Sequence, residues 1–349
     1  MASGVLAGHF FLPRIYRARQ KNVRFRTVRP GPVQYLSLVN SPDPAKRPDV
    51  IDCLIVGAGP AGLTAAVYLA RYRRRIRLIS AGPSRAQLIP LTHNFPGFPD
   101  GVSGANLLER LQAQAFNYGV ETETGRIESL EHGDGRGFAA TSGEEVIRAA
   151  TVILATGVVD QHPDFDGLSE ATLSGLVRWC PICDGYEVMD QSIAILSPAK
   201  PGLRHALFLR TYTRRITLLA LGDSQGLSQD EVSQMEAAEI EFLTAPVVSF
   251  KADAGNKCVV VALADGTERR FDTVYPMHGC SAQGGLATAL GARSDAQGDL
   301  VVDARQQTSV AGLYAVGDVV SALNQISVGI GHAAIAATAV HNSLARVGR

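Results

Sequence analysis

The feature that most constrains the fold is a glycine-rich turn between an apolar strand and a helix. Residues 50–56 form a short apolar run, typical of a parallel strand buried on both faces. The turn GAGPAG at 57–62 follows, then a helical pattern over 63–72 and a second apolar strand over 76–80. In a G-x-G-x-x-G turn, the first glycine permits the tight bend, the second lets the backbone approach a pyrophosphate, and the third lets helix and strand pack closely. The pattern predicts a dinucleotide site whose phosphates face the N–H groups of the helix N-terminus.

The end of the second strand is where such sites contact a ribose. An acidic residue about 20 residues beyond the turn usually makes that contact. Here the position holds Ser80, followed by Ala81 and Gly82. We therefore expect a weaker ribose contact from Ser80, or a contact made by other groups.

Two later strands are expected to close the same site. The run TVILATG at 151–157 ends in a tight turn of small residues, and the run GLYAVGDVV at 312–320 carries Asp318 near its end. An acid at the carboxyl end of a parallel strand lies in the crevice where such sheets bind ligands. Asp318 could instead cap a helix. The spacing predicts a dinucleotide domain split by a long insertion.

The segment RWCPICDGYE at 178–187 holds Cys180 and Cys183 with Asp184 directly behind them. A zinc site would need a second pair of ligands, and the chain has no other C-x-x-C and no H-x-x-x-H. A structural disulfide does not suit a reducing compartment, and five cysteines are too few for a disulfide framework. A redox dithiol fits best, because closely spaced cysteines stabilise each other's thiolate and close a small reversible ring. Asp184 could carry the proton that one sulfur releases or needs, or could be a turn residue before Gly185.

Composition narrows the function classes. The 349 residues suffice for two domains, and 46% apolar with 19% charged residues is ordinary for a globular enzyme. A formal net charge of zero gives no reason to expect a nucleic-acid or membrane partner. No apolar run reaches the length of a membrane span. We expect a cytoplasmic enzyme with no metal.

The N-terminal segment differs from the rest of the chain. Residues 1–42 contain no Asp or Glu and seven Lys or Arg residues. This is the composition of an organellar transit segment. Pro13, Pro30 and Pro32 would interrupt a long amphipathic helix, which favours a disordered extension or a misassigned start.

Taken together, these motifs resemble the low-molecular-weight thioredoxin reductase family. The matching pieces are GAGPAG with its helix, residues 93–115, VILATG, CPICDG and residues 308–319, in the family's order and spacing. The resemblance implies an α/β fold of two Rossmann-like, three-layer ββα dinucleotide-binding domains, the second inserted in the first. The implied parts are an extension over 1–49, the first part of an FAD-binding domain over 50–164, an inserted NAD(P)H-like domain carrying the cysteines over 165–286, and the second part of the FAD domain over 287–349.

The resemblance also assigns residues. It implies that Cys183 faces the flavin C4a atom, that Cys180 exchanges with an external partner, and that Asp184 donates or accepts the proton. A final helix over 325–346 would aim its N-terminus at the flavin, where its dipole stabilises the anionic reduced form. The candidate cofactor-binding residues are Gly57, Gly59, Pro60, Ala61, Gly62, Ser80, Asn94, Ala155, Thr156, Gly157, Gly317, Asp318, Asn324, Gln325 and Ile326.

The inserted domain should carry a second glycine-rich turn for NADPH, and this turn is altered. A strand over 193–196, a helix over 203–212 and a strand over 215–220 are predicted, but the turn between the first two reads SPAKPG at 197–202. Only its third glycine remains, two prolines remove N–H donors, and the Ala199 side chain would crowd a pyrophosphate. Lys200 could still contact a phosphate.

Two more stretches of the inserted domain depart from the family. The arginines that bind the 2′-phosphate of NADPH are replaced by Leu221-Gly222-Asp223-Ser224, while Arg214 and Arg215 precede the strand at its other end. The run VYPMHGC at 274–280 stands where the family has an apolar strand ending in Ile-Gly. The sequence thus predicts FAD as cofactor and a lost or remodelled NADPH site.

The leading hypothesis is an FAD-dependent disulfide oxidoreductase that serves a thioredoxin-like protein or a small dithiol. Without NADPH, either O₂ would reoxidise the flavin with release of hydrogen peroxide, or a ferredoxin-like donor would reduce it. One alternative is an NADPH-dependent thioredoxin reductase with a remodelled site, and another is a non-catalytic flavin redox sensor. The resemblance implies a homodimer.

Overall fold

The computed structural model describes six stretches of the chain, namely 50–133, 137–161, 168–221, 227–253, 255–320 and 323–345. Within them no helix is long and apolar enough to cross a membrane. Two sequence-based expectations concern residues outside these stretches. They are the extension over 1–49 and the acidic loop at 222–224.

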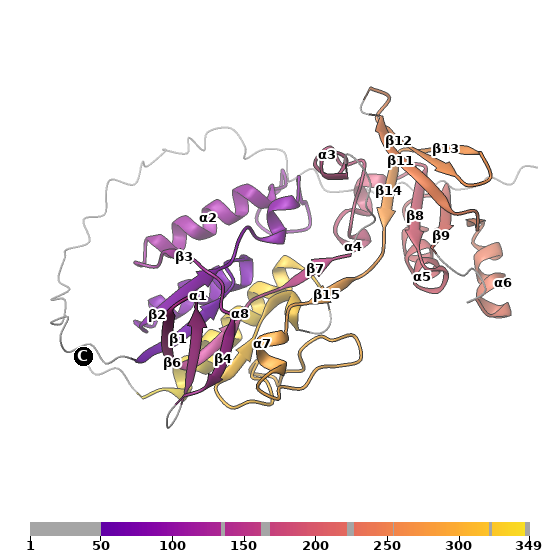
Figure 1. Ribbon diagram of the computed structural model, residues 1–349. Coiled ribbons are helices and arrows are strands. Elements are labelled where there is room, and N and C mark those ends of the chain that lie inside the picture. The colour runs from indigo at the N-terminus through magenta and orange to yellow at the C-terminus, as the bar shows by residue number, and fades with distance from the viewer. Residues whose placement is uncertain are drawn as a thin grey trace, which may run out of the picture. The chain divides into compact units, whose positions relative to one another are not determined.

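The larger sheet has seven strands in the order β3-β2-β1-β6-β5-β4, with β16 also paired to β6 (Figure 1). Its strands are β1 (Val50–Val56), β2 (Ile76–Ser80), β3 (Thr122–Thr124), β4 (Ser129–His132), β5 (Phe138–Ser142), β6 (Glu145–Leu154) and β16 (Leu313–Ala315). The strands β3, β2, β1, β6 and β16 run parallel, and β5 and β4 extend the sheet in antiparallel fashion. The predicted bounds of β1 and β2 are confirmed.

Strand β1 is apolar throughout its second half because both of its faces are buried. Cys53 and Ile55 lie in the core cluster shared with the helices α1 and α8, whereas Leu54 and Val56 lie in a second cluster on the opposite face. Successive side chains of a strand point to opposite faces, so a strand covered on both sides needs an unbroken apolar run.

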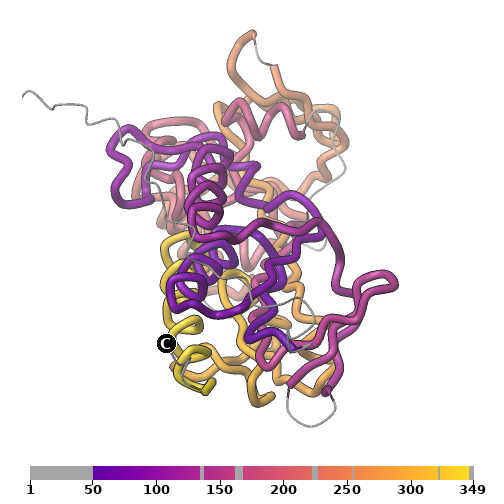
Figure 2. Tube along the Cα trace, turned by 90° about the vertical axis from the view of Figure 1, so that its left-hand side faces the viewer, coloured from indigo at the N-terminus to yellow at the C-terminus, as the bar shows by residue number. Residues whose placement is uncertain are grey.

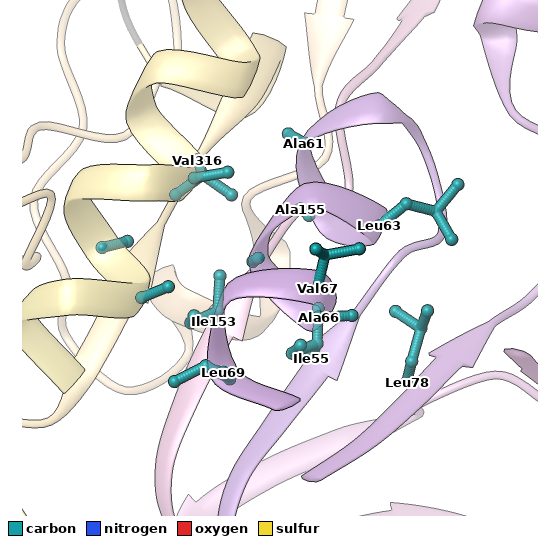
Figure 3. Packing of buried hydrophobic residues seen from close by; sticks show 14 of the residues in the cluster. Ile55, Ala61, Leu63, Ala66, Val67, Leu69, Leu78, Ile153, Ala155 and Val316 are labelled. Carbon is teal, nitrogen blue, oxygen red and sulfur yellow. The ribbon is translucent and has the colours of Figure 1, made fainter. Parts of the chain in front are cut away.

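Helices α1 (Pro60–Arg71) and α8 (Ile326–Ser343) pack together although they are far apart in sequence (Figures 1 and 2). Pro60 stands at the first helical turn, where its fixed φ favours the helix and its missing N–H costs nothing. Fully buried alanines of both helices allow the close approach: Ala65, Ala66, Ala333, Ala336 and Ala337. Figure 3 shows the apolar side chains of α1 gathered near Ile55 and Ile153 of the strands, with α8 alongside.

The inserted region forms a four-stranded parallel sheet in the order β10-β9-β8-β14 and a three-stranded antiparallel sheet in the order β11-β12-β13. The strands are β8 (Ile193–Ser197), β9 (Ile216–Ala220), β10 (Glu241–Leu243), β11 (Val247–Asp253), β12 (Cys258–Leu263), β13 (Glu268–Phe271) and β14 (Thr273–Pro276). Helices α5 (Ala199–Leu209) and α6 (Gln229–Ala237) complete it. Together, the seven-stranded sheet and this four-stranded parallel sheet confirm the predicted fold class of two Rossmann-like domains.

Two short antiparallel strands, β7 (Val158–Asp160) and β15 (Cys280–Ala282), lead out of the first sheet and back to it. The domain boundaries predicted at 164/165 and 286/287 lie a few residues from these strands and stay a prediction. The remaining elements are α2 (Gly104–Phe116), α3 (Leu168–Leu173), α4 (Pro181–Asp184), α7 (Gly285–Thr288) and the 3-10 helices at Arg85–Leu88, Tyr186–Val188 and Gly317–Val319.

Three predicted helices have other bounds in the structure. The helix expected over 63–72 is α1, which begins at Pro60, and the final helix expected over 325–346 is α8, which ends at Ser343. The helix expected over 203–212 is α5, which begins at Ala199 and ends at Leu209. The two prolines of SPAKPG, which suggested a stiff loop, instead take the N-cap position and the first helical turn. Both positions tolerate proline because their N–H groups have no helical partner.

Gly62 allows a direct test of this close packing. A Cβ atom at Gly62 would lie 1.8 Å from the Gly57 carbonyl oxygen. We expect Gly62→Ala to destabilise the protein by about 1–3 kcal/mol, as overpacked sites do, and to lower its FAD content. Gly331→Ala is the control, because its Cβ would meet no atom within 4 Å; it should keep the FAD content and should not lower the melting temperature, since alanine favours a helix over glycine. An unchanged Gly62→Ala protein would contradict the argument.

Candidate active site

The two cysteines of CPICD form a disulfide at the start of α4. The Sγ atoms of Cys180 and Cys183 are 2.03 Å apart. Cys180 is the N-cap residue, and its sulfur accepts a hydrogen bond of 3.2 Å from the Cys183 N–H. Pro181 follows at the first helical position, where it favours the turn that brings the sulfurs together.

The side chain of Gln325, the N-cap residue of α8, reaches this disulfide. Its Nε2 atom lies 3.2 Å from the Cys183 sulfur and 3.4 Å from the Cys180 sulfur. Asn94 donates to the Gln325 Oε1 atom at 2.9 Å, and Thr92 Oγ1 lies 2.8 Å from the Asn94 Oδ1 atom. Asn94 and Gln325, both predicted as cofactor-binding residues, thus form one chain of hydrogen bonds that ends at the sulfurs.

Asp184, the predicted proton carrier, lies in a largely buried polar group. Its Oδ2 atom accepts from Arg178 Nη1 at 3.1 Å, and its Oδ1 atom accepts from the Tyr275 hydroxyl at 2.9 Å. Burial raises the pKa of the Asp184 carboxyl above its usual range, against the Arg178 guanidinium, which lowers it. These contacts show that Asp184 is more than a turn residue, while its role as proton carrier stays a prediction.

A second carboxylate stands close to Asp184 in the same segment. The Glu187 Oε1 atom lies 3.0 Å from the Nδ1 atom of His93, and the charge of Glu187 further raises the pKa of Asp184. No motif marked Arg178 or Glu187, although both lie in the run 178–187 with Asp184. Tyr275 and His93 come from distant segments, and they join this group only through the fold.

The first glycine-rich turn has the geometry of a dinucleotide cradle. Gly57 has a φ of 106°, and a Cβ atom there would lie 2.3 Å from the Ala155 carbonyl oxygen. The first-turn N–H groups of α1, at Ala61 and Gly62, have no partner within the helix by helical geometry and face an incoming anion. The turn therefore fits a pyrophosphate.

A small cavity of about 130 Å³ lies at the carboxyl ends of β1 and β2. Ser80 lines it and donates a hydrogen bond of 3.0 Å to the Gly82 carbonyl. The other lining residues are Ala58, Gly82, Pro83, Ser84, Leu108, Gln112, Thr122 and Thr124. Its hydroxyl and amide groups suit a ribose or a base, so this end of the site also fits FAD.

Asp318 reaches the same region from the far end of the chain. It lies inside the 3-10 helix Gly317–Val319 and does not cap a helix. Gly317 has a φ of 75°, and its Cβ would lie 3.1 Å from the Ala61 side chain, so this segment runs close to the start of α1. Burial raises the pKa of Asp318, and the neighbouring Arg85 lowers it.

Arg85 is a site residue that the sequence did not reveal. Its guanidinium binds Asp160 of β7 through contacts of 2.5 and 2.7 Å and lies 3.6 Å from Asp318. It therefore holds two carboxylates from distant segments beside the cradle. No local pattern marks an arginine that has its partners only after folding.

The remaining predicted residues lie beside these groups. Thr156 donates to the Gln283 carbonyl at 2.7 Å, and Gly157 has a φ of 65°. Asn324 Nδ2 lies 3.8 Å from the exposed Cys280 sulfur, and Ile326 begins α8. Across the described stretches, His, Cys, Asp and Glu side chains form no group of three that could hold a metal. The cofactor contacts of these residues stay a prediction.

The corresponding turn of the inserted region is shorter. Three residues join β1 to α1, whereas only Pro198 joins β8 to α5. Ser197 remains in strand pairing with Ala220 and is fully buried, and within the described part of the chain its hydroxyl has no hydrogen-bond partner. Lys200 pairs with Glu231 at 3.3 Å.

Comparisons with known proteins agree with this geometry. Residues 51–338 match the family of pyridine nucleotide-disulphide oxidoreductases. A thioredoxin reductase of Listeria monocytogenes serovar 1/2a is 28% identical over 308 residues, which cover 84% of this chain and 93% of that protein. The crystal structure of thioredoxin reductase from Streptococcus pyogenes MGAS5005 has a TM-score of 0.77 and 25% identity, covering 84% of this chain and 98% of that one. The crystal structure of HlmI also has a TM-score of 0.77, with 30% identity, 85% of this chain and 93% of that one.

The fold, the disulfide and these likenesses define a flavin-dependent disulfide oxidoreductase. The chain belongs to the pyridine nucleotide-disulphide oxidoreductase family, and within it to the low-molecular-weight thioredoxin reductases, as its motifs predicted.

Arg85 supplies a test of the FAD cradle. Losing a unit charge within ~10 Å of a pyrophosphate costs about 1–2 kcal/mol at an effective dielectric constant of ~20, and we expect Arg85→Gln to weaken FAD binding about tenfold. The measurement is FAD titration into apoprotein. Arg77→Gln is the control, because Arg77 also bridges two carboxylates, Glu123 and Glu145, in the same sheet. Equal affinities for the two variants would contradict a cradle role for Arg85.

Proposed function

We propose that this enzyme passes electrons between FAD and the Cys180–Cys183 pair, and on to a thiol or disulfide partner, without ordinary use of NADPH. The observation that carries the proposal is the disulfide at the N-terminus of α8, in contact with Gln325 and next to the buried Asp184. FAD, when bound, supplies a two-electron donor or acceptor at this place.

The protein groups have separate roles in the proposed reaction. Oxidation of a partner dithiol removes two electrons and two protons and forms the partner disulfide, while the Cys180–Cys183 disulfide opens to two thiols. Cys180 is assigned to exchange with the partner and Cys183 to the flavin side. Asp184 holds one of the protons, which its raised pKa favours.

Limited use of NADPH is supported by the turn between β8 and α5. A pyrophosphate cradle needs a glycine-rich loop, and a single proline stands in its place. Lys200 is already paired with Glu231, and Arg215 lies at the opposite end of β9, 4.0 Å from Asp272. Lys200 and Arg215 therefore already have carboxylate partners, and the segment after β9 where a 2′-phosphate would be expected lies outside the described residues.

The partner is proposed from chemistry and from relatives. Relatives named thioredoxin reductase make a thioredoxin-like protein one candidate, and a small dithiol or disulfide is the other. O₂ or a ferredoxin-like protein would complete the electron path when NADPH does not. A homodimer in the cytoplasm is proposed on the family resemblance.

A further relative, named NADPH-dependent thioredoxin reductase 3 of Arabidopsis thaliana and 28% identical over 281 residues, favours a second candidate function. It is an NADPH-dependent thioredoxin reductase that uses a remodelled nucleotide site. A flavin-bound redox sensor without turnover is disfavoured by the polar groups assembled around the disulfide.

Anaerobic titration separates the first two candidates. We expect dithiothreitol to bleach the flavin absorbance, and NADPH and NADH to leave it largely unchanged, because the second cradle is missing. Admission of air after dithiol reduction should restore the absorbance and release hydrogen peroxide. Rapid bleaching by NADPH would establish the NADPH-dependent reductase instead. No bleaching by any of these reductants would support the sensor.

Serine variants test the order of the two sulfurs. Neither Cys180→Ser nor Cys183→Ser should allow bleaching by dithiols. In Cys180→Ser the flavin spectrum should change with pH as the free Cys183 thiol ionises, because that thiol faces the flavin. In Cys183→Ser the free Cys180 should form a stable mixed disulfide with a thiol partner. The opposite pattern would reverse the assignment.

A further inference from the structure

We propose that Tyr275 is a positioning residue that, together with Arg178, orients the Asp184 carboxyl beside the Cys180–Cys183 pair and favours its ionised form against the effect of burial. This inference rests on the proposed function, in which Asp184 exchanges a proton with the pair.

Tyr275 occupies an unusual place for a polar side chain. It lies in β14, the edge strand of the parallel sheet, and is fully buried in an apolar cluster with Ile193, Ile195 and Leu203. A buried phenol normally finds a hydrogen-bond partner, because leaving the hydroxyl unpaired is costly. The partner here is the Asp184 Oδ1 atom at 2.9 Å.

Strand β14 also fixes the backbone that leads to the disulfide. The Arg178 N–H donates to the Val274 carbonyl at 3.0 Å, and Val177 forms a bridge with Val274. Strand β14 therefore holds the redox segment at two points. Val274 binds the backbone of Arg178, two residues before Cys180, and Tyr275 binds the carboxyl of Asp184, directly after Cys183. This places Asp184 in a fixed position relative to both sulfurs.

The two donors occupy both oxygens of the carboxyl. Arg178 Nη1 lies 3.1 Å from Oδ2, and the Tyr275 hydroxyl occupies Oδ1. Both donors favour the ionised form, while burial and the charge of Glu187 oppose it; Glu187 is itself paired with His93. Removing the phenol hydroxyl takes away one stabilising bond and leaves the opposing effects in place, so the carboxyl should keep its proton to higher pH.

The proposed role of Tyr275 offers another explanation for the run VYPMHGC at 274–280. From the sequence, the departure of this run from the family's apolar strand indicates a loss of nucleotide binding. The contact of Tyr275 with Asp184 shows that the tyrosine of this run is directed toward the redox segment.

The test is Tyr275→Phe in the FAD-loaded protein, with two measurements across pH. The first is the rate of iodoacetamide alkylation of dithiothreitol-reduced enzyme, which requires no turnover and no electron acceptor. The second is the rate of flavin bleaching by dithiothreitol. In the plot of each rate against pH, the ionisation of Asp184 should produce a step, and this step should be absent in Asp184→Asn. Loss of a hydrogen bond to a charged group should move this step upward by about one pH unit.

Two comparisons separate positioning from a general structural effect. In an Asp184→Asn background, Tyr275→Phe should change neither profile further, because the two residues act through one bond. Tyr314→Phe removes the hydroxyl of another buried tyrosine, in β16, and should leave the step unmoved. If Tyr275→Phe does not fold, Arg178→Gln removes the other donor together with its charge and should also shift the step upward.

The proposal is overturned if Tyr275→Phe folds and its alkylation profile superimposes on that of the unmodified enzyme, or if Tyr275→Phe shifts the profile equally in the Asp184→Asn background. If dithiothreitol fails to bleach the flavin of the unmodified enzyme, the proposed function fails, and the alkylation profile still decides the role of Tyr275.

Discussion

The contact between the Gln325 amide and the two sulfurs is the interaction on which the site depends. It joins α4 to the N-cap residue of α8, across 142 residues of sequence. The strands β7 and β15 make it possible, because their antiparallel pairing returns the chain to the first sheet close to where it left. A redox pair carried by an inserted region can act on a cofactor only if such a connection brings it to the other domain's helix terminus.

Around this contact, two buried carboxylates share one electrostatic arrangement: burial raises the pKa of each, and a neighbouring arginine lowers it. Asp184 is held by Arg178 and by the Tyr275 phenol, and its pKa nevertheless rises because burial outweighs both donors. Burial also raises the pKa of Asp318, and the Arg85 guanidinium lowers it. A raised pKa suits Asp184, which is proposed to carry a proton. For Asp318, the nearby cation offsets the cost of a negative charge beside a site for an anionic cofactor.

The two strand–turn–helix units, β1 with α1 and β8 with α5, have the same order of elements but different turns. At 57–62 the left-handed Gly57 and the tightly packed Gly62 leave backbone open to a phosphate. In the second unit the helix begins at Ala199, one residue after the strand, and the buried hydroxyl of Ser197 points to no partner in the described chain. The second unit keeps the packing of its helix on its strands through one apolar cluster, and differs from the first unit in the single residue, Pro198, that joins strand to helix.

The sequence by itself determined the fold class, the split domain and the chemical identity of the disulfide, because these depend on local patterns: apolar strands, a glycine turn and a C-x-x-C spacing. It misplaced the start of α5, because prolines are equally compatible with a loop and with a first helical turn. Only the tertiary structure decided the partners of Asp184, the bridging by Arg85 and the reach of Gln325 to the sulfurs. Those contacts join residues from separate segments, and no local pattern encodes which side chains meet after the sheets have formed.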